Sequence, residues 1–527
     1  MKKRLFKILS ISLASVFVLV ACAQPAPVEV SDAIADVPGL EGNGEVQEEL
    51  RVVVNSLPIS LDPHFNNDTP SIRFRRTVFE SLIFQNYMDL SLEPGLAVAW
   101  DMSDPQAVEL ELRQGVTFHN GDPFNAEAVR FSLLRAADSP GILGMSNMIE
   151  DVEIVDDYNV IVHLNIPFVP MLNQLALSQL AIVSPRAVEE AEAAGREFGD
   201  EPVGTGPFVF EEFIPGSHLH LLRNDDWWGN APAFESMMVR AIAEQGNRLI
   251  EIETGNADIA IDVAPMDIPH AEASPNVVVH QGPSTSITYL GFNMMEGPLA
   301  DIRVRHAIKH ALNMDAIVDI AFSGAARTAD SLISTMTWGH AGQEPFEVDL
   351  NIASELLADA GFPGGEGLDL RVWYNAGNQQ RADMAEMIQN QLLAIGINVV
   401  VETLEWSSYL ERTANGEHDM FILGWAPSTQ DPDVSLFALL HSSNVGNPGN
   451  RSFFIHERAD YLLEAGRSEL DYDARLEIYA ELMQIVRDEA PVMFAVEQDT
   501  IHFTRPGVNG FYPTPNALQH FYRVYFD

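Results

Sequence analysis

Two pairs of histidines have a spacing at which their side chains could share one metal ion. His306 and His310 are four residues apart in a stretch with helical periodicity, so both rings can lie on one face of a helix. His218 and His220 alternate along a predicted strand and also share a face. Neither pair has an evident carboxylate or third histidine beside it, and two ligands make a poor site for a divalent metal. We therefore interpret both pairs as solvated polar faces and predict no metal site.

Sequence motifs of the common catalytic and nucleotide sites are absent. The chain has no H-E-x-x-H zinc motif, no G-x-S-x-G nucleophile turn and no C-x-x-C pair. A Walker loop for ATP is excluded because Gly-Lys-Ser/Thr does not occur, and Gly204-Thr205-Gly206 lacks the third glycine of a dinucleotide loop. A secreted hydrolase would need a nucleophile and a base in a recognisable arrangement. We predict a binding protein with no cofactor rather than an enzyme.

Cys22 is the only cysteine of the chain and ends the tetrad Leu19-Val20-Ala21-Cys22. A basic start and an apolar run over residues 8–20 precede it, which is the order of an export signal. The run is shorter than the roughly 20 residues that a membrane-spanning helix needs. The tetrad resembles the lipobox of bacterial lipoproteins, which implies that residues 1–21 are removed and that Cys22 is acylated. The alternative is an ordinary signal peptide with an incidental cysteine.

Length and charge limit the remaining possibilities. The 527 residues exceed what one hydrophobic core usually serves, so we expect two or three lobes. The formal net charge of −46 repels phosphate backbones and anionic lipid headgroups, which excludes nucleic acid as a partner and leaves the lipid anchor as the membrane contact. Residues 22–47 are rich in Ala, Pro, Gly, Val and Glu without a sustained period and are predicted to form a flexible linker.

Helical and strand patterns alternate along the rest of the chain. Apolar residues recur at helical spacing over 126–137, 303–320, 351–360 and 381–395. Alternating or continuous apolar runs predict strands over 157–164, 217–222, 288–293, 368–374 and 398–403. This alternation predicts a mixed α/β body built from several lobes.

Several motifs follow one another in a fixed order over most of the chain. They include Ser60-Leu61-Asp62-Pro63-His64, Leu112 to Phe124, Gly204-Thr205-Gly206-Pro207-Phe208, Arg223 to Trp228, Gly255 to Ile259 and Asp301 to Ile308. Together they resemble family 5 of the ABC-transporter solute-binding proteins, the peptide and nickel type. The resemblance implies a periplasmic-binding-protein-like α/β fold, in which two α/β lobes joined by a two-strand hinge carry an additional inserted lobe.

The resemblance also implies a division of the chain and a function. The first lobe would comprise residues 48–90, 204–290 and 500–527, the inserted lobe 91–203 and the second main lobe 291–499, with hinge crossings near 288–293 and 500–503. Such a protein captures a peptide-like ligand by hinge closure and delivers it to an ABC permease with separate ATPase subunits. We expect it to act as a monomer. Nickel chelates, sugars and opines are alternative ligands, and a sensor that presents its ligand to a receptor has the same sequence signals.

The loop from Gly424 to Asp431 is similar to the ligand loop of dipeptide and oligopeptide binders. In those proteins an aspartate after the tryptophan pairs with the ligand's α-amino group, and that position holds Ser428 here. The arginine for the dipeptide carboxylate falls on Trp373. Because a buried ammonium needs a charge partner, either Asp431 or Asp433 takes over this role, or the ligand is not an ordinary dipeptide. The loop is more similar to that of the glutathione-binding branch.

We therefore predict one set of ligand-binding residues. Its members are Trp425, Ser428, Thr429, Asp431, Asn293, Trp373 and Arg451. Trp425 follows a predicted apolar strand at a loop entry, which favours exposure to a cleft, although core packing is the common alternative for a tryptophan. Arg451 would supply an anion contact in an acidic protein. Arg113 and Asp122 are interpreted as structural turn residues of the inserted lobe.

Overall fold

The structure is a computed structural model and describes residues 48–65, 68–140, 142, 146–427, 429–446, 449–516 and 518–527. The predicted signal peptide, Cys22 and the whole predicted linker over residues 22–47 lie outside these residues. Within the described part of the chain, no helix combines the length and the apolar character that crossing a membrane requires.

One sheet of eleven strands runs through the molecule. Its order is β15 (Asn398–Leu404), β14 (Asp369–Asn375), β16 (Met420–Trp425), β12 (Val278–Phe292), β17 (Val492–Thr504), β11 (Ile259–Ala260), β1 (Glu49–Val54), β10 (Ser236–Ala241), β9 (His218–Arg223) and β8 (Phe208–Ile214), and β13 (Ala326–Thr328) also pairs with β17. The sheet is mixed, because β14 runs parallel to β15 and β16 whereas β12 and β17 are antiparallel.

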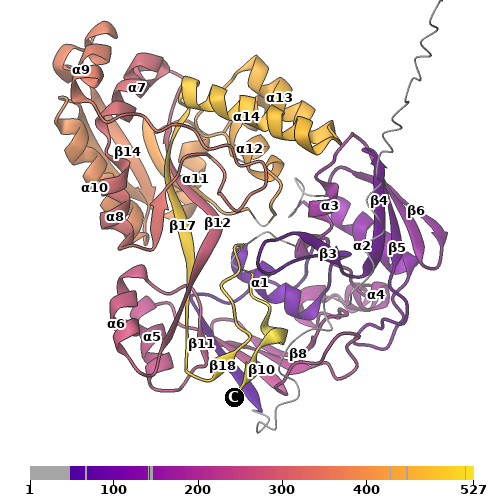
Figure 1. Cartoon of the computed structure of the whole chain (residues 1–527). Helices are drawn as coiled ribbons and strands as arrows, with labels where there is room; N and C mark the ends of the chain where they lie inside the picture. The colour runs from indigo at the N-terminus through magenta and orange to yellow at the C-terminus, as the bar shows by residue number, and fades with distance from the viewer. Residues whose placement is uncertain are drawn as a thin grey trace, which may run out of the picture.

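β12 and β17 connect the two halves of the molecule (Figure 1). They are 15 and 13 residues long and pair with each other along their length. At one end β12 pairs with β16, and at the other end β17 pairs with β11. A register shift between Pro283 and Ile287 interrupts the ladder between these ends. The predicted fold class, two α/β lobes on a two-strand hinge, is confirmed. The lobe boundaries remain a prediction.

The second main lobe packs helices on the β15-β14-β16 end of the sheet. These are α7 (Ile302–Ala311), α8 (Met314–Phe322), α9 (Leu350–Asp359) and α10 (Gln379–Leu393), joined by α11 (Trp406–Ala414), α12 (Asp433–Leu440), α13 (Glu457–Ser468) and α14 (Tyr472–Glu489). The single helix predicted over 303–320 is wrong at its centre. Asn313 lies between α7 and α8, and its side chain accepts a hydrogen bond from Ala316 N, so it caps a new helix.

The first lobe surrounds the other end of the sheet. Its helices are α1 (Thr69–Val78), α5 (Gln245–Glu253) and α6 (Ile268–Ala273), and the chain ends with the short pair β18 (Val508–Asn509) and β19 (Tyr525–Phe526). Asp68 caps α1 by accepting from Ser71 N, and Pro70 stands in the first turn, where its missing N–H costs nothing. The cap and the proline therefore fix the residue at which α1 begins.

The predicted inserted lobe is built on a separate antiparallel sheet. Its strands are β4 (Ala97–Asp104), β5 (Ala107–Leu112), β7 (Asn159–Leu164) and β6 (Ile149–Asp156), with α2 (Ala126–Ala137) on one face and β2 (Ile83–Gln85), β3 (Leu92–Pro94), α3 (Met171–Gln174) and α4 (Pro185–Ala193) around it. Burial alternates along β5 and β7, as expected when one face packs on a core. Arg113 Nε donates to Gly95 O, and Asp122 accepts from Arg186 Nε, so both side chains bond within the protein.

Candidate functional site

A cleft of about 270 Å³ is bounded by both halves of the molecule. The first lobe contributes residues near α5 and after β11, the hinge strands contribute their central residues, and α10 contributes its first turn. The polar lining residues are Gln245, Asp262, Ser284, Ser286, Asn378, Gln380, Arg381, Gln498, Asp499, Thr500 and His502. A cleft between two hinged lobes is a usual position for a small-ligand site. We call it the interlobe cleft.

Arg381 is the cation of the interlobe cleft. Asn378 caps α10 by accepting from Arg381 N, which places the arginine in the first turn of the helix. Its Nη1 donates to Asn375 Oδ1 at the end of β14, and a Cβ at position 424 would lie 2.7 Å from its Nη2. Burial lowers the pKa of the guanidinium, and among the described residues no carboxylate forms an ion pair with it. It can therefore receive an anionic group.

The acidic groups of the cleft, by contrast, have partners within the protein. Asp262 accepts two hydrogen bonds from Arg73, at 2.9 and 3.0 Å. Burial opposes ionisation of Asp262, but the charge and hydrogen bonds of Arg73 outweigh it and lower its pKa. Asp499 accepts from Gln281 Nε2 at 2.6 Å and lies 3.6 Å from Arg327. The cleft thus presents amide and hydroxyl groups together with one unneutralised cation.

A second arginine, Arg451, acts with Arg381 on the buried side chain of Tyr289. The charges of Arg451 and Arg381 both act on Tyr289, whose pKa is nevertheless raised by burial. The Tyr289 hydroxyl is buried and has no hydrogen-bond partner among the described residues. Arg451 is 5% exposed, and its Nε donates to Thr413 Oγ1 at 3.0 Å. The predicted residue Arg451 is therefore buried and does not line the interlobe cleft.

The end of β16 and the loop that follows it contain four of the seven predicted binding residues, Trp425, Ser428, Thr429 and Asp431. Trp425 is half-buried, and its indole N–H is buried without an acceptor among the described residues. The Thr429 hydroxyl is buried and likewise without a partner there. Ser428 lies outside the described residues. The loop is held beside the hinge because Thr285 Oγ1 donates to Pro427 O at 2.9 Å.

Asp431 and Asp433 both form ion pairs with arginines of the same lobe. Asp431 is 1% exposed and pairs with Arg475, with Nη2 to Oδ1 at 3.0 Å. Burial raises the pKa of Asp431 although the charge of Arg475 opposes this. Asp433 pairs with Arg467 at 2.7 Å. A ligand ammonium would have to compete with these arginines for either carboxylate.

Asn293 and Trp373 are buried in the protein and do not line the interlobe cleft. Asn293 Nδ2 donates to Gly416 O and His418 O at 2.9 Å each, and its Oδ1 accepts from Met295 N. Trp373 is fully buried, and the guanidinium of Arg412 lies 4.5 Å from its ring centroid. Both side chains are thus engaged in holding the lobe together in this structure.

The structure places Trp425 at the end of β16 and Thr429 and Asp431 in the loop that follows, but none of the described members of the predicted set lines the interlobe cleft. Arg381 lines it and was not among them. Its signal was available in the sequence, because an arginine at the start of a predicted helix that follows a predicted strand after a short loop lies near the carboxyl edge of a parallel sheet. No sequence pattern indicated that Asp431 and Asp433 would form ion pairs with Arg475 and Arg467.

The histidine pairs have partners that are not metals. His306 Nε2 lies 2.8 Å from Asp488 O, His310 Nδ1 lies 2.7 Å from Glu347 O, and His218 Nε2 lies 3.0 Å from Glu212 Oε2. Within the residues that the structure describes, no group of three or more His, Cys, Asp or Glu side chains could hold a metal ion.

Comparison with known proteins gives a consistent family. The family described as bacterial extracellular solute-binding proteins, family 5, matches residues 91–447. The chain is 28% identical to the dipeptide-binding protein of Escherichia coli K12, over 82% of this chain and 85% of that protein. It is 27% identical to a glutathione-binding protein of Salmonella typhi, over 93% and 96%. The structure resembles that of the Helicobacter pylori periplasmic binding protein DppA in complex with the peptide STSA, with a TM-score of 0.80, 28% identity and coverage of 91% and 98%.

Proposed function

Because this chain belongs to family 5 of the bacterial extracellular solute-binding proteins, we propose that it captures a peptide-like solute in the interlobe cleft and delivers it to an ABC permease. The observation that carries this proposal is Arg381, a cation without a carboxylate partner among the described residues, facing a cleft of about 270 Å³. Pockets of roughly 300–1,000 Å³ hold drug-sized ligands, so a short peptide would fit after modest opening.

The ligand in this proposal has a free carboxylate that pairs with Arg381. Its amide groups bond to the side chains of Gln245, Gln498 and Asn378, which offer both donors and acceptors. Trp425 and Thr429 are not among the lining residues of the cleft, so in this proposal they reach the ligand only when the lobes move. Trp425 then forms an apolar wall, and Ser428 and Thr429 contribute their hydroxyl groups. Asp431 would contact a ligand ammonium only by sharing its carboxylate with Arg475. This arrangement favours a ligand whose negative end is recognised more strongly than its positive end.

A calorimetric panel tests the proposal and identifies the ligand. Free amino acids, dipeptides, longer peptides, glutathione and nickel chelates are titrated into the purified protein, and the tightest peptide is compared with its C-terminally amidated form. Arg381→Gln should weaken the carboxylate form at least about 30-fold, corresponding to about 2 kcal/mol, and leave the amidated form nearly unchanged. Arg458→Gln, which removes an exposed arginine paired with Glu481, is the control. Binding of nickel chelates alone, or equal effects on both peptide forms, would overturn the proposal.

We further propose that the protein is tethered to the outer face of the cell membrane through Cys22. The support is the lipobox-like tetrad and the apolar run before it. Metabolic labelling with a fatty-acid analogue should mark the wild-type protein, and Cys22→Ala should abolish the label. Label that persists in Cys22→Ala would show that the anchor lies elsewhere.

A further inference from the structure

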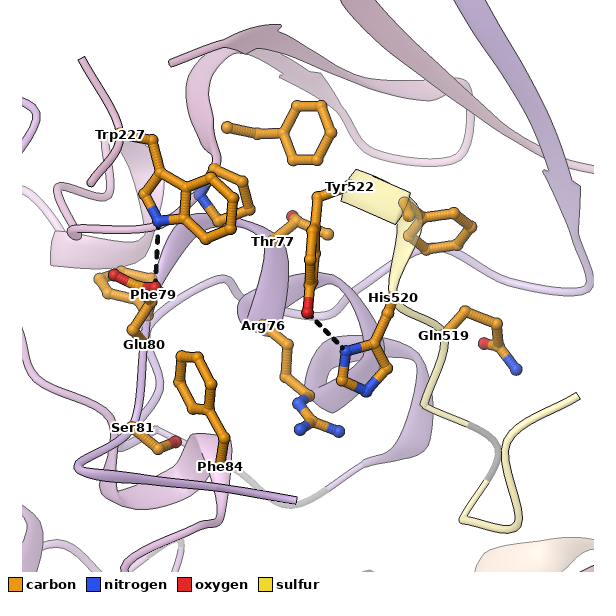
Figure 2. A pocket seen from close by; sticks show the side chains of 13 residues that line it. Arg76, Thr77, Phe79, Glu80, Ser81, Phe84, Trp227, Gln519, His520 and Tyr522 are labelled. Carbon is orange, nitrogen blue, oxygen red and sulfur yellow. Dashed lines mark hydrogen bonds between the residues drawn. The ribbon is translucent and has the colours of Figure 1, made fainter. Parts of the chain in front are cut away.

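A second pocket, of about 40 Å³, lies within the first lobe (Figure 2). It shares no lining residue with the interlobe cleft. The last turn of α1 supplies Arg76 and Thr77, the following residues supply Phe79 and Glu80, and the chain near the C-terminus supplies Gln519 to Tyr522. Aromatic rings form much of the remaining wall. A small polar group in such a pocket is shielded from water.

Arg76 carries an uncompensated charge into this pocket. Its Nη1 is buried and has no hydrogen-bond partner among the described residues, and the arginine forms no ion pair there. Its neighbours on α1 differ, because Arg73 pairs with Asp262 and Arg75 donates to Ser60 O. Burial lowers the pKa of Arg76 to about 10, so the guanidinium is still charged at neutral pH. Arg76 as a whole is partly buried, but its buried Nη1 has no partner among the described residues, and an anion in the pocket would supply one.

The one acidic residue that lines the pocket is engaged elsewhere. Glu80 accepts from the indole N–H groups of Trp227 at 3.1 Å and Trp228 at 2.8 Å. Figure 2 shows Glu80 beside Trp227, and Arg76 extending instead toward His520. Burial raises the pKa of Glu80 to about 7, so near neutral pH it holds a proton about half of the time. Glu80 therefore does not replace a counter-ion for Arg76.

A second cation strengthens the positive potential around His520. Arg523 Nε is buried without a hydrogen-bond partner among the described residues, and its guanidinium lies 4.2 Å from the Tyr87 ring centroid. Burial lowers the pKa of His520 well below its usual value, and the charges of Arg76 and Arg523 lower it further. Neither Arg76 nor Arg523 forms an ion pair with a carboxylate among the described residues, although the net charge of the chain is −46.

We propose that the pocket beside Arg76 binds a small monovalent anion of halide size, held by the guanidinium of Arg76. Its volume exceeds the roughly 10–15 Å³ that one water molecule needs, and it is too small for a peptide. The ring of His520, whose Nδ1 lies 3.4 Å from the Tyr522 hydroxyl, faces Arg76 on the polar side of the site, and Phe84 is among the aromatic residues that line the pocket (Figure 2). The site is structural and independent of solute capture.

Bromide is the probe because its anomalous scattering identifies it in a crystal. Crystals of the wild-type protein soaked in sodium bromide should show an anomalous peak within hydrogen-bond distance of Arg76, and crystals of Arg76→Gln should lack it while retaining bromide at surface sites. A wild-type crystal with surface bromide but no peak beside Arg76 would overturn the proposal. A peak of equal height in both proteins would show an adventitious ion only.

Thermal unfolding gives a second readout that needs no crystal. At constant ionic strength, replacing gluconate with bromide should raise the wild-type melting temperature progressively with concentration. The rise should disappear in Arg76→Gln and in Arg76→Met, and remain in Arg458→Gln. Arg76→Met should itself fold well in gluconate, because it removes the unpaired charge rather than a bond. Identical bromide dependence in all four proteins would overturn the proposal.

Discussion

Asp431 and Arg475 form a two-pronged ion pair in the interior of the second main lobe. Arg475 Nη1 lies 3.1 Å from Asp431 Oδ2 and Nη2 lies 3.0 Å from Oδ1. The same guanidinium donates from Nε to Gly466 O at 2.8 Å and from Nη2 to the Tyr479 hydroxyl at 3.2 Å. The pair therefore fastens the loop after β16, which contains Thr429 and follows Trp425, to α13 and α14.

Asp431→Asn should lower the free energy of unfolding by about 3–5 kcal/mol, because it leaves the buried guanidinium of Arg475 without its counter-ion. Chemical denaturation measures the difference. Glu481→Gln, which breaks an exposed pair with Arg458, should cost less than about 1 kcal/mol. Equal losses in the two variants would contradict a role for Asp431 in anchoring the loop. A calorimetric titration of Asp431→Asn with the ligand then measures whether Asp431 also contributes to the affinity for a ligand ammonium.

Glu80 should make the protein less stable as the pH rises from about 4.5 to about 7. Burial raises its pKa from 4.5 to about 7 in the folded state, so the unfolded chain releases this proton first. The free energy of unfolding falls across that interval by roughly 3 kcal/mol from this group alone. Glu80→Gln mimics the protonated side chain and should remove this fall, as measured by urea denaturation at several pH values.

Buried histidines change the free energy of unfolding with pH in the opposite direction to Glu80. The quantity to compare is therefore the difference in the free energy of unfolding between Glu80→Gln and wild type at each pH. Burial lowers the pKa of His64, His119 and His418 to about 4 and that of His502 to about 3. Each of these groups destabilises the folded state as the pH falls below 6.5, in both proteins alike. A wild-type curve parallel to that of Glu80→Gln between pH 4.5 and 7 would show that Glu80 is not protonated in the fold.

The sequence was sufficient for the fold class because the relevant signals are local or ordered along the chain. Apolar periodicity located α2, α9 and α10 within a few residues, and the order of motifs indicated the hinged two-lobe architecture. Apolar periodicity did not reveal the break between α7 and α8. A single polar residue such as Asn313 can be either a helix cap or a solvated position within a helix, and the pattern does not tell which. Strand β12 begins at Val278, ten residues before the predicted strand over 288–293. The prediction missed this first half because its polar residues interrupt the apolar pattern.

The candidate site was less predictable because its electrostatics depend on distant pairs. Asp431 and Arg475 are 44 residues apart, and Arg73 and Asp262 are 189 residues apart. No local pattern tells which carboxylates have a counter-ion, so Asp431 could not be distinguished from an acid that is available to a ligand. For the same reason Arg381 was not predicted as a binding residue. It stands out because no carboxylate among the described residues pairs with it, and no sequence motif shows this.

Two of the tryptophans in the second main lobe, Trp373 and Trp425, should respond differently to substitution. Trp373 is fully buried, so Trp373→Ala should cost about 3–5 kcal/mol of stability. Trp425 is half-buried with an unbonded indole N–H, so Trp425→Phe should leave stability within about 1 kcal/mol of wild type. If Trp425 walls the ligand, this variant should also lose the change in tryptophan fluorescence that ligand produces. A fluorescence change that persists in Trp425→Phe would place the ligand away from this ring.

Thr285 lies in the register shift of β12 and is positioned to hold the two lobes closed. Its N–H donates to Pro515 O at 2.8 Å, and its hydroxyl donates to Pro427 O at 2.9 Å, so one residue of the hinge bonds the C-terminal segment and the loop after β16. A buried hydrogen bond contributes about 1 kcal/mol.

Thr285→Val keeps the shape of the side chain and removes only the hydroxyl bond, so it should shift the equilibrium toward the open form. We expect the ligand affinity to fall about fivefold, and the decrease in radius of gyration on ligand addition, measured by small-angle scattering, to become smaller at subsaturating ligand. Thr254→Val removes an exposed hydroxyl bond at the end of α5 and should change neither quantity. Wild-type affinity and wild-type compaction in Thr285→Val would mean that the bond to Pro427 is equally present in the open and closed forms, because a contact shifts an equilibrium only if the two states differ in it.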